Sequence, residues 1–433
     1  MNEGRIVVAI DVGTSKIVTI IAKVDESVNV LGVSEVPSVG VRKGQIVDIE
    51  EAVTAINSSL EAAERMAGYS ASHVIASIGG NHIESQNSRG VVAVAQPEGE
   101  IKETDLVRVI DAAKAVSLPS SREILHVLPR SYIVDGQEGI KDPIGMTGVR
   151  LEVDTHIISA SSTSVRNLEK AYSEVGVDVD SIVSSGYASS LAVLSDTEKE
   201  LGVVLVDIGA GTTDICVYVE GSVAYSSVLP IGARHITNDL AIGLRISLES
   251  AEKIKLHLSS PSKKARVADE EEFEEEQKPR EKSDELDLGQ LHLPEELSKV
   301  SQKTLIDGII RPRLNEIFTM IGLEIKKSGY AGQTPSGLVI TGGGARTIGV
   351  SDAAKRMLAM PVRIGYPLNI KGIIDEIQDT SFSTVIGLAT YGQGVESKGS
   401  LPFGFSIPSF PFGQIKFNKY FSKGISFFKS FLP

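Results

Sequence analysis

The sequence predicts an α/β fold of two related lobes that face each other across a cleft, each lobe carrying an inserted subdomain. The main observation is a loop that occurs twice, in which an apolar strand ends in Asp-x-Gly and hydroxyl residues lead into a second strand. The first copy contains Asp11, Gly13, Thr14, Ser15 and Lys16, and the second contains Asp207, Gly209, Gly211, Thr212 and Thr213. The other observation is an apolar strand at residues 338–341 that runs into Gly342, Gly343 and Gly344.

The residues of the two loops suit phosphate groups. Glycine lets the backbone come close to a phosphate, and successive N–H groups in a turn form a concave anion site. The hydroxyl residues add donors, and Lys16 adds a positive charge. One such loop could be an ordinary β-hairpin, because Gly-Thr and Gly-Ser turns are common. Two copies in the same register favour a pair of hairpins that grip phosphates from both sides.

A metal and a nucleoside can be accommodated beside these loops. Asp11 and Asp207 stand at the ends of their strands, where they can hold Mg²⁺ through water, since Mg²⁺ keeps several waters and binds few carboxylates. The three glycines at 342–344 leave room for an adenosine or ribose on bare backbone, before a helix expected at residues 351–358. Alone this segment would be a plain strand-to-helix turn, but beside two phosphate loops it completes a nucleotide site.

These three segments resemble the phosphate and adenosine motifs of the actin/Hsp70/sugar-kinase superfamily, whose members bind ATP between two related halves. No Gly-x-x-x-x-Gly-Lys-Ser/Thr segment occurs, which disfavours a P-loop NTPase. Residues 83–160 interrupt the first half directly after a strand at 74–78, which is similar to the FtsA family of actin-like bacterial cell-division proteins. Further stretches that resemble this family lie at residues 200–204, 309–313, 362–370 and 384–388.

The chain is expected to divide into two core subdomains, two insertions and a tail. The expected boundaries are 1–82 plus 162–195 for the first core, 83–161 for its insertion, 196–234 plus 333–395 for the second core, 235–332 for its insertion, 396–415 for a linker and 416–432 for a terminal helix. Apolar spacing predicts helices at 49–66, 103–116, 164–175 and 179–194. Residues 261–290 contain a block of acidic residues framed by basic ones, which is typical of a flexible solvated loop. A flap that keeps the insertion off anionic lipid or screens a basic partner site is the alternative.

The C-terminal segment combines aromatic and basic residues at helical spacing. No acidic residue follows Glu396. The expected membrane-binding residues are Phe417, Lys419, Tyr420, Phe421, Lys423, Ile425, Phe428, Phe431 and Leu432. A basic amphipathic helix of this kind suits the interface of an anionic membrane, where each lysine can add about 1 kcal/mol. Packing back onto the protein is the alternative, but a helix behind a long Pro/Gly linker is poorly placed to complete a core.

Composition sets broad limits on function. The chain has 433 residues, 42% of them hydrophobic, which is enough for several cored domains. The net charge of −13 argues against general nucleic-acid binding. A single cysteine, Cys216, fits a reducing cytoplasm rather than a disulfide framework. No apolar run reaches the roughly 18 residues that a membrane-spanning helix needs.

Hydrolysis is expected to be slow. In the superfamily, a Gln or Glu on the element that links the two halves orients the attacking water. The corresponding residues 181–191 contain no Gln, Glu, Asp or His. General-base assistance typically contributes about 10²–10⁴-fold, so ATP is expected to act mainly as a conformational ligand.

The resemblance implies further contacts and partners. A helix like the one that carries Glu252 and Lys255 contributes a Glu and a Lys to the nucleoside in related proteins, although a solvated ion pair is the alternative. FtsA proteins form filaments and tether the tubulin-like FtsZ to the inner face of the cytoplasmic membrane at the division site. They bind the FtsZ C-terminal peptide through the second insertion, where Lys303, Arg311 and Arg313 could meet acidic groups. They help recruit later division proteins through the first insertion.

Two other interpretations share the fold. One is a metabolic kinase, which would need a catalytic Asp beside a sugar pocket. The other is a PilM-like adaptor of pilus assembly, which lacks a basic amphipathic tail. A chaperone is disfavoured, because no substrate-binding domain follows residue 395.

Overall fold

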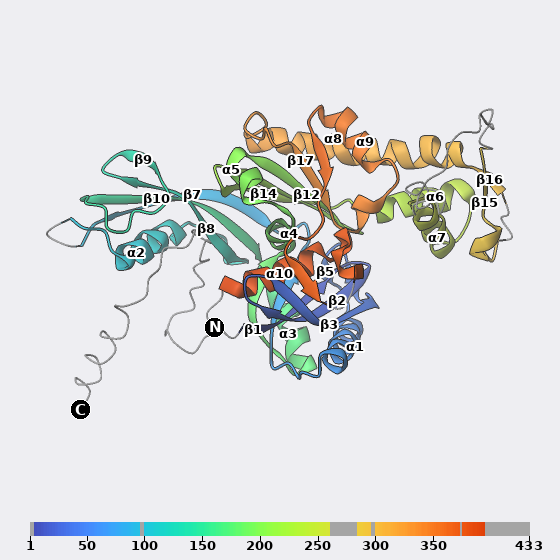
Figure 1. Ribbon diagram of the computed structural model, residues 1–433, viewed down its shortest axis with the longest axis horizontal. Coiled ribbons are helices and arrows are strands. Elements are labelled where there is room, and N and C mark those ends of the chain that lie inside the picture. The colour runs from blue at the N-terminus through green and yellow to red at the C-terminus, as the bar shows by residue number, and fades with distance from the viewer. Residues whose placement is uncertain (1–3, 96–98, 260–283, 296–298, 373–374, 395–433) are drawn as a thin grey trace, which may run out of the picture. The chain divides into compact units, whose positions relative to one another are not determined.

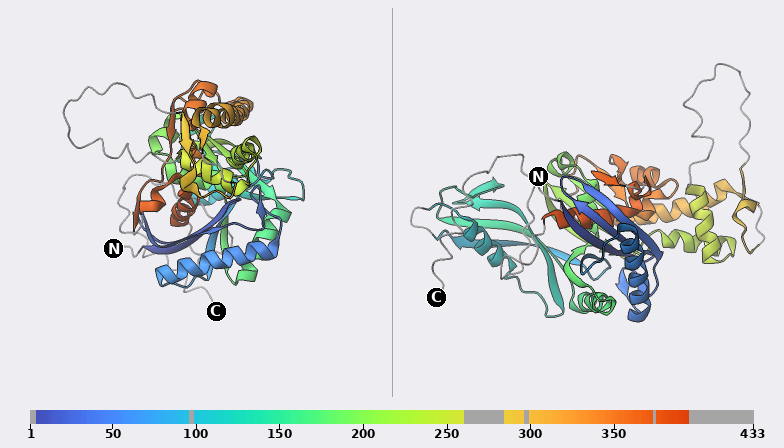
Figure 2. Two further views of the ribbon diagram at one scale, coloured as in Figure 1. Left: turned by 90° about the vertical axis from the view of Figure 1, so that its right-hand side faces the viewer. Right: turned by 60° about the horizontal axis from the view of Figure 1, so that its bottom comes forward.

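The computed structural model describes residues 4–95, 99–259, 284–295, 299–372 and 375–394. The first lobe is built on a six-stranded sheet in the order β11-β6-β1-β2-β3-β19 (Figure 1). Its strands are β1 (Arg5–Val12), β2 (Lys16–Val24), β3 (Val28–Pro37), β6 (His73–Ile78), β11 (Asp178–Ser184) and β19 (Ile370–Gly372). Helix α1 (Ile49–Ala67) packs on β2 and β3 and lies along one face of the sheet (Figure 2). Asp48 accepts the Glu51 N–H at its start, and Gly68 ends it in the left-handed conformation.

The second lobe repeats the topology of the first. Its five-stranded sheet has the order β14-β13-β12-β17-β18. The strands are β12 (Val203–Ile208), β13 (Thr213–Val219), β14 (Ser222–Leu229), β17 (Leu338–Thr341) and β18 (Val362–Ile364). In both lobes three antiparallel strands are followed by strands parallel to the first, so β6 lies beside β1 as β17 lies beside β12. The doubled loop of the sequence therefore corresponds to a doubled fold unit.

A separate sheet is inserted into the first lobe between β6 and α3 (Ser162–Val175), and it extends to the left in Figure 1. Its order is β7-β10-β8-β9, with strands β7 (Glu84–Ala93), β8 (Arg122–Val134), β9 (Gln137–Ile140) and β10 (Arg150–Ser161). Helix α2 (Glu103–Lys114) packs on β7 and β10. Residues including Ile101, Val109 and Leu151 form a hydrophobic core that is separate from the cores of the lobes.

The second lobe carries an insertion of helices and a small hairpin, at the right of Figure 1. Its elements are α6 (Arg234–Leu244), α7 (Leu248–Ser259), β15 (Glu285–Asp287), a 3₁₀ turn (Gly289–Leu291), β16 (Lys299–Ser301) and a π-helical turn (Thr304–Ile310). The π-helical turn continues directly into α8 (Arg311–Ser328). Leu258, Leu288 and Leu305 are buried in the same core as the sheet residues of the second lobe. This insertion is thus packed onto its lobe rather than separately cored.

Two short helices cross between the lobes. These are α4 (Ser185–Val193) and α10 (Ser383–Gly394), and they pack so closely that a Cβ on Gly387 would lie 1.8 Å from the Ala188 carbonyl oxygen. Only glycine fits at position 387, so this residue fixes the spacing of α4 and α10. The remaining α-helices of the described residues are α5 (Asp196–Leu201) and α9 (Val350–Leu358).

The expected helices are present with one error. The predicted helices at 49–66, 103–116 and 164–175 are confirmed as α1, α2 and α3. The prediction of a helix over 179–194 was wrong in its first half, because β11 occupies Asp178–Ser184 and pairs with β6 before α4 begins. The β-branched residues of this segment pack in a parallel sheet, where apolar spacing does not distinguish a buried strand from a helix.

Some predictions fall outside the described residues. The linker at 396–415, the terminal helix at 416–432 and most of the acidic segment 261–290 belong to this group. Within the described part of the chain, no helix is both long and apolar enough to cross a membrane.

The helix crossing gives a prediction about stability. Replacing Gly387 by alanine forces the α4 backbone aside, and overpacking of this kind destabilises by about 1–3 kcal/mol or more. We expect the melting temperature of Gly387→Ala to fall by several degrees in calorimetry. Gly332→Ala is the matched control, because its added Cβ meets nothing within 4 Å. Equal melting temperatures for both variants and the unmodified chain would contradict the close crossing.

Candidate functional site

The two predicted phosphate loops adopt the same turn. In the first, the Gly13 N–H donates to the Lys16 carbonyl at 3.0 Å, and in the second the Gly209 N–H donates to the Thr212 carbonyl at 2.9 Å. Each loop links the first two antiparallel strands of its lobe. The shared Gly-to-carbonyl hydrogen bond closes a tight turn in both.

The loops face each other across the lobes. A Cβ on Gly211 would lie 2.9 Å from the Thr14 hydroxyl oxygen, which places loop 209–212 directly against loop 13–16. The start of α6 is hydrogen-bonded to the second loop. The N–H groups of Ala233 and Arg234 donate to the carbonyls of Gly209 and Ala210 at 2.9 Å each. The structure therefore brings together the loop residues that the sequence singled out.

Three acidic side chains converge beneath the loops. Asp207 and Asp214 are directly opposite each other on β12 and β13, and both are buried. Asp207 accepts hydrogen bonds from Ser189 and from Thr384, the latter at 3.2 Å. Burial raises the pKa of Asp207 to about 6, and the charge of Asp11 adds to this rise. Burial likewise raises the pKa of Asp214 well above its usual range, with Asp207 and Asp11 contributing.

Asp11 completes this acidic group from the first lobe. Burial raises its pKa, while a hydrogen bond from Ser77 at 2.6 Å and the charge of Lys16 lower it. One oxygen of Asp214, Oδ1, has no hydrogen-bond partner although it is buried. Desolvated negative charge and an orphaned carboxylate oxygen fit a divalent cation nearby. Among the described residues, no group of three acidic, His or Cys side chains is arranged to hold a metal ion directly.

Lys16 contacts residues of both lobes. Its ammonium group lies 2.6 Å from Glu35 Oε2 and 3.0 Å from Ser381 Oγ. It also stands 4.3 Å from the centre of the Phe382 ring. The side chain therefore connects the first phosphate loop to the segment just before α10.

The glycine-rich loop after β17 lies against the acidic group. Gly342 has φ of +83°, and a Cβ there would lie 2.1 Å from Asp207 Oδ1. The Gly342 carbonyl accepts a hydrogen bond from Thr380 Oγ1 at 2.9 Å. Gly343 and Gly344 begin a 3₁₀ turn over Gly343–Arg346 that leads toward α9. The three predicted glycines are thus adjacent to the second phosphate loop.

Glu252 and Lys255 form an ion pair on α7 that differs from a solvated surface pair. Lys255 is buried, with its Nζ 2.7 Å from Glu252 Oε2 and 2.9 Å from Thr237 Oγ1 on α6. The Thr237 hydroxyl donates to Glu252 at 2.5 Å. The pair joins α6 to α7, and at the end of α7 Ser259 accepts the Ile348 N–H at 3.3 Å, between the 3₁₀ turn Gly343–Arg346 and α9.

Asp214 is the functional candidate that sequence reasoning did not assign. In the sequence analysis only Asp11 and Asp207 were expected to hold a metal. The Asp214 carboxylate accepts a hydrogen bond from the backbone of Gly186, at the start of α4. A Cβ on Gly186 would lie 2.9 Å from the Asp214 Cβ. The signal available in the sequence was the hairpin register, which places residue 214 opposite residue 207. Residues 181–191 lack acidic side chains, but Gly186 among them lies beside Asp214.

The three basic residues predicted to bind a partner peptide differ in their exposure and in their contacts with acidic side chains. Arg313 is bound to Asp239 at 2.5 and 2.8 Å and to Glu316. Arg311 pairs with Asp307 at 2.6 Å. Lys303 is exposed, and its N–H donates to Asp284 at 2.9 Å. Internal ion pairs thus engage both arginines.

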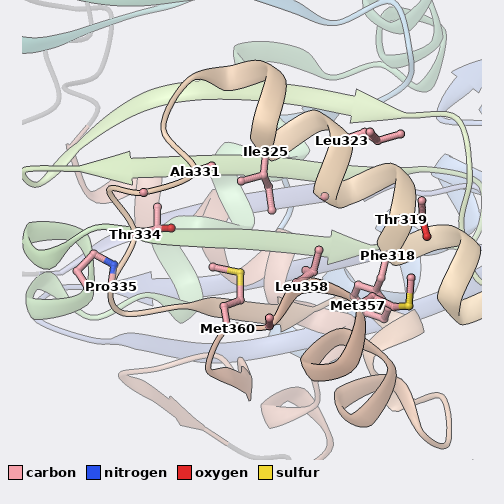
Figure 3. Close-up of a pocket in the computed structure, with 13 residues that line it drawn as sticks. Phe318, Thr319, Leu323, Ile325, Ala331, Thr334, Pro335, Met357, Leu358 and Met360 are labelled. Atoms are coloured by element: carbon pink, nitrogen blue, oxygen red, sulfur yellow. The ribbon is translucent and has the colours of Figure 1, made fainter.

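A pocket of about 510 Å³ lies between α8, the end of α9 and the segment 331–335 (Figure 3). Phe318, Ile325 and Leu358 are among the apolar side chains that line it. None of its lining residues belongs to the predicted nucleotide site.

Comparison with protein families and known sequences gives a consistent result. Residues 80–159 match the SHS2 domain inserted in FtsA, and residues 204–387 match the cell division protein FtsA. The chain is 37% identical over 401 residues to FtsA of Pseudomonas aeruginosa, covering 92% of each chain. It is 41% identical over 391 residues to FtsA of Borreliella burgdorferi, covering 89% of this chain and 91% of the relative. FtsA of Escherichia coli K12 is 34% identical over 401 residues, covering 90% and 91%.

Solved structures agree on the actin-like fold. The PilM-PilN type IV pilus biogenesis complex aligns with a TM-score of 0.62 at 14% identity, covering 89% of this chain and 98% of that chain. The ethanolamine utilization protein EutJ of Carboxydothermus hydrogenoformans aligns with a TM-score of 0.50 at 16% identity, covering 90% of each. At such low identity the likeness concerns the fold alone. The predicted α/β architecture of two related lobes is confirmed.

The buried acidic group gives a prediction about pH. The folded-state pKa of Asp207 is about 6 against an unfolded value of 3.8, so ionised Asp207 destabilises the protein above pH 6. This penalty shrinks as the pH falls from 6 toward 4, because the folded state then binds the proton. We expect Asp207→Asn to stabilise the ligand-free protein by about 2 kcal/mol at pH 7.5, with the gain fading below pH 5. Denaturant unfolding at several pH values measures it.

The control for this variant is Asp178→Asn, an exposed acid on β11. It should change stability by less than about 0.5 kcal/mol at any pH. A stability loss for Asp207→Asn at pH 7.5 would show that the ionised carboxylate is favourable in the folded state, contrary to this account.

Proposed function

The chain belongs to the FtsA family of cell-division proteins. We propose that it binds Mg²⁺·ATP between its two lobes and links division filaments to the membrane. The observation that carries the nucleotide part is the pair of identical turns, 13–16 and 209–212, facing each other over buried carboxylates. Turn N–H groups and hydroxyls of both loops would hold the phosphates. Asp11 and Asp207 would hold Mg²⁺ through water.

The remaining cleft residues take complementary roles in this proposal. Lys16 would exchange its contacts with Glu35 and Ser381 for phosphate oxygens. Gly342, Gly343 and Gly344 would receive the adenosine, with α7 and its Glu252–Lys255 pair on the other side. Bound Mg²⁺ would neutralise the acidic group that burial disfavours.

Hydrolysis would be slow or negligible in this protein. The linking element at 181–191 offers no acidic or amide side chain to orient water. Asp214 lies beside α4, but as a member of the buried acidic group it would face the metal rather than orient the attacking water. ATP would then act mainly by holding the lobes in one arrangement.

The membrane part of the proposal rests on the sequence of the tail. Residues 416–432 carry the aromatic face and flanking lysines that suit an anionic bilayer. The protein would be peripheral, on the cytoplasmic face of the inner membrane at the division site. It would form filaments of its own, bind the FtsZ C-terminal peptide through the insertion at 235–332 and recruit later division proteins through the inserted sheet.

The peptide site is supported most by Lys303. It is exposed, whereas Arg311 and Arg313 are engaged by Asp307 and Asp239. An acidic peptide group would meet Lys303 first and would have to displace an internal carboxylate to reach either arginine. The pilus-adaptor and kinase alternatives are not favoured, since the sequence relatives described above, at 34–41% identity, are FtsA proteins.

The test of the tether is liposome flotation of the full chain with anionic vesicles, with and without ATP. We expect the full chain to float and a chain ending at Glu396 to remain at the bottom. Phe421→Glu is a matched variant, because it keeps the tail and its lysines but places a charge on the apolar face. It should float much less.

Two results would contradict the tether. If all three proteins float equally, binding does not depend on the tail. If none floats, the tail does not anchor the protein to anionic lipid.

A further inference from the structure

A small hairpin that the nucleotide motifs do not include lies against both phosphate loops. It consists of β4 (Val41–Arg42) and β5 (Gln45–Ile46), joined by Lys43 and Gly44. Both turn residues have positive φ, 50° for Lys43 and 73° for Gly44. A two-residue hairpin turn of this kind strongly prefers Asn-Gly or Asp-Gly. Lysine in the left-handed conformation costs about 1 kcal/mol, so local backbone preference does not account for it.

The tip of this hairpin lies between the two phosphate loops. The Gly44 N–H donates to Thr14 Oγ1 in the first loop at 2.9 Å. A Cβ on Gly211 in the second loop would lie 3.1 Å from the Lys43 Cα and 2.9 Å from Thr14 Oγ1. Gly211 of the second loop therefore faces both Thr14 of the first loop and the backbone of Lys43.

The packing of the tip leaves it little freedom. A Cβ on Gly44 would lie 2.8 Å from the Gly79 carbonyl carbon and from the Gly80 nitrogen, so backbone meets backbone there. The Gln45 amide donates to Asn81 at 3.1 Å beside it. The hairpin is thus fixed on one side by residues 79–81 and on the other by the loops. A side chain leaving this tip begins from a defined position.

The negative charges near the two phosphate loops favour a second basic side chain there. Lys16 is the single basic residue of the predicted loops, and its charge lowers the pKa of Asp11. A bound nucleotide would bring several phosphate charges to the same loops. Lys43 is exposed, and among the described residues it makes no side-chain hydrogen bond or ion pair. Its flexible four-carbon stem carries a compact charge and starts where the two loops meet.

We propose that Lys43 binds the terminal phosphate of the nucleotide and that Gly44 orients the Thr14 hydroxyl toward it. The Gly44 N–H occupies a lone pair of Thr14 Oγ1, which leaves the hydroxyl proton free to be donated to a phosphate oxygen. This inference rests on the proposed binding of ATP in the cleft. The hairpin would then respond to the presence of the terminal phosphate, because the charge of Lys43 lies where the two loops meet.

Positive φ by itself does not single out Lys43. Six other described residues that are not glycine share it, among them Arg245 and Ala359, which end helices. Lys43 differs from these because its backbone lies against one phosphate loop while its neighbour Gly44 donates to the other. The placement between the loops carries the proposal.

The test uses Lys43→Asn, which removes the charge but places the residue that the turn prefers. ATP and ADP affinities of the full chain are measured by titration calorimetry with Mg²⁺. We expect Lys43→Asn to lose about 10- to 100-fold in ATP affinity, as for a charged hydrogen bond, and less than about threefold in ADP affinity. Its melting temperature should equal or exceed that of the unmodified chain, and Lys43→Arg should recover most of the ATP affinity.

Arg42→Gln is the matched control, since Arg42 is an exposed cation one residue earlier on the same hairpin. It should leave both affinities unchanged. Unchanged ATP affinity in Lys43→Asn overturns this inference while ATP binding itself stands. An equal loss for ATP and ADP, or the same loss in Arg42→Gln, also overturns it. If the unmodified chain binds no ATP, the proposed function fails and this inference with it.

Discussion

The candidate site depends on two acidic side chains, Asp207 and Asp214, that the sheet of the second lobe holds in buried positions. Asp207 and Asp214 face each other across β12 and β13 and are buried, and like charges directly opposite in a sheet destabilise it. Burial raises the pKa of both. Serine and threonine hydroxyls stabilise Asp207 in part, but Asp214 keeps an oxygen without a partner. The folded protein thus stores electrostatic free energy that a bound cation would release.

The elements around this pair connect it to the rest of the molecule. β13 carries Asp214 and pairs with β14, which also packs against the inserted sheet. There Ser85 Oγ donates to the Ser226 carbonyl at 2.6 Å, and His156 Nε2 lies 2.9 Å from Ser226 Oγ. Burial lowers the pKa of His156 to about 3, so its imidazole is uncharged at neutral pH. On the opposite side, Thr384 links Asp207 to α10, one of the two helices that cross between the lobes. The acidic pair is therefore closely connected to both the insertion and the lobe crossing.

Sequence reasoning found the parts that depend on local pattern. The doubled loop predicted the doubled lobe, because Asp-x-Gly and its flanking strands are contiguous in the chain. Contacts between distant segments were not predictable in the same way. Neither the neighbourhood of Asp214 and Gly186 nor the pairing of Arg313 with Asp239 has a local signal. Residues 179–184 were taken for helix, since a short buried strand and a buried helix share the same apolar content. Lys43 went unnoticed because a lysine acquires meaning only once the fold places it between two loops.

In the proposed complex both loops together hold Mg²⁺·ATP. Amide hydrogen exchange of the full chain, with and without Mg²⁺·ATP, measures each loop separately. We expect slower exchange at residues 13–16 and 209–212 alike, and no such change with ATP when Mg²⁺ is removed by chelation. Protection of one loop alone, or of neither, would contradict a nucleotide held between the lobes.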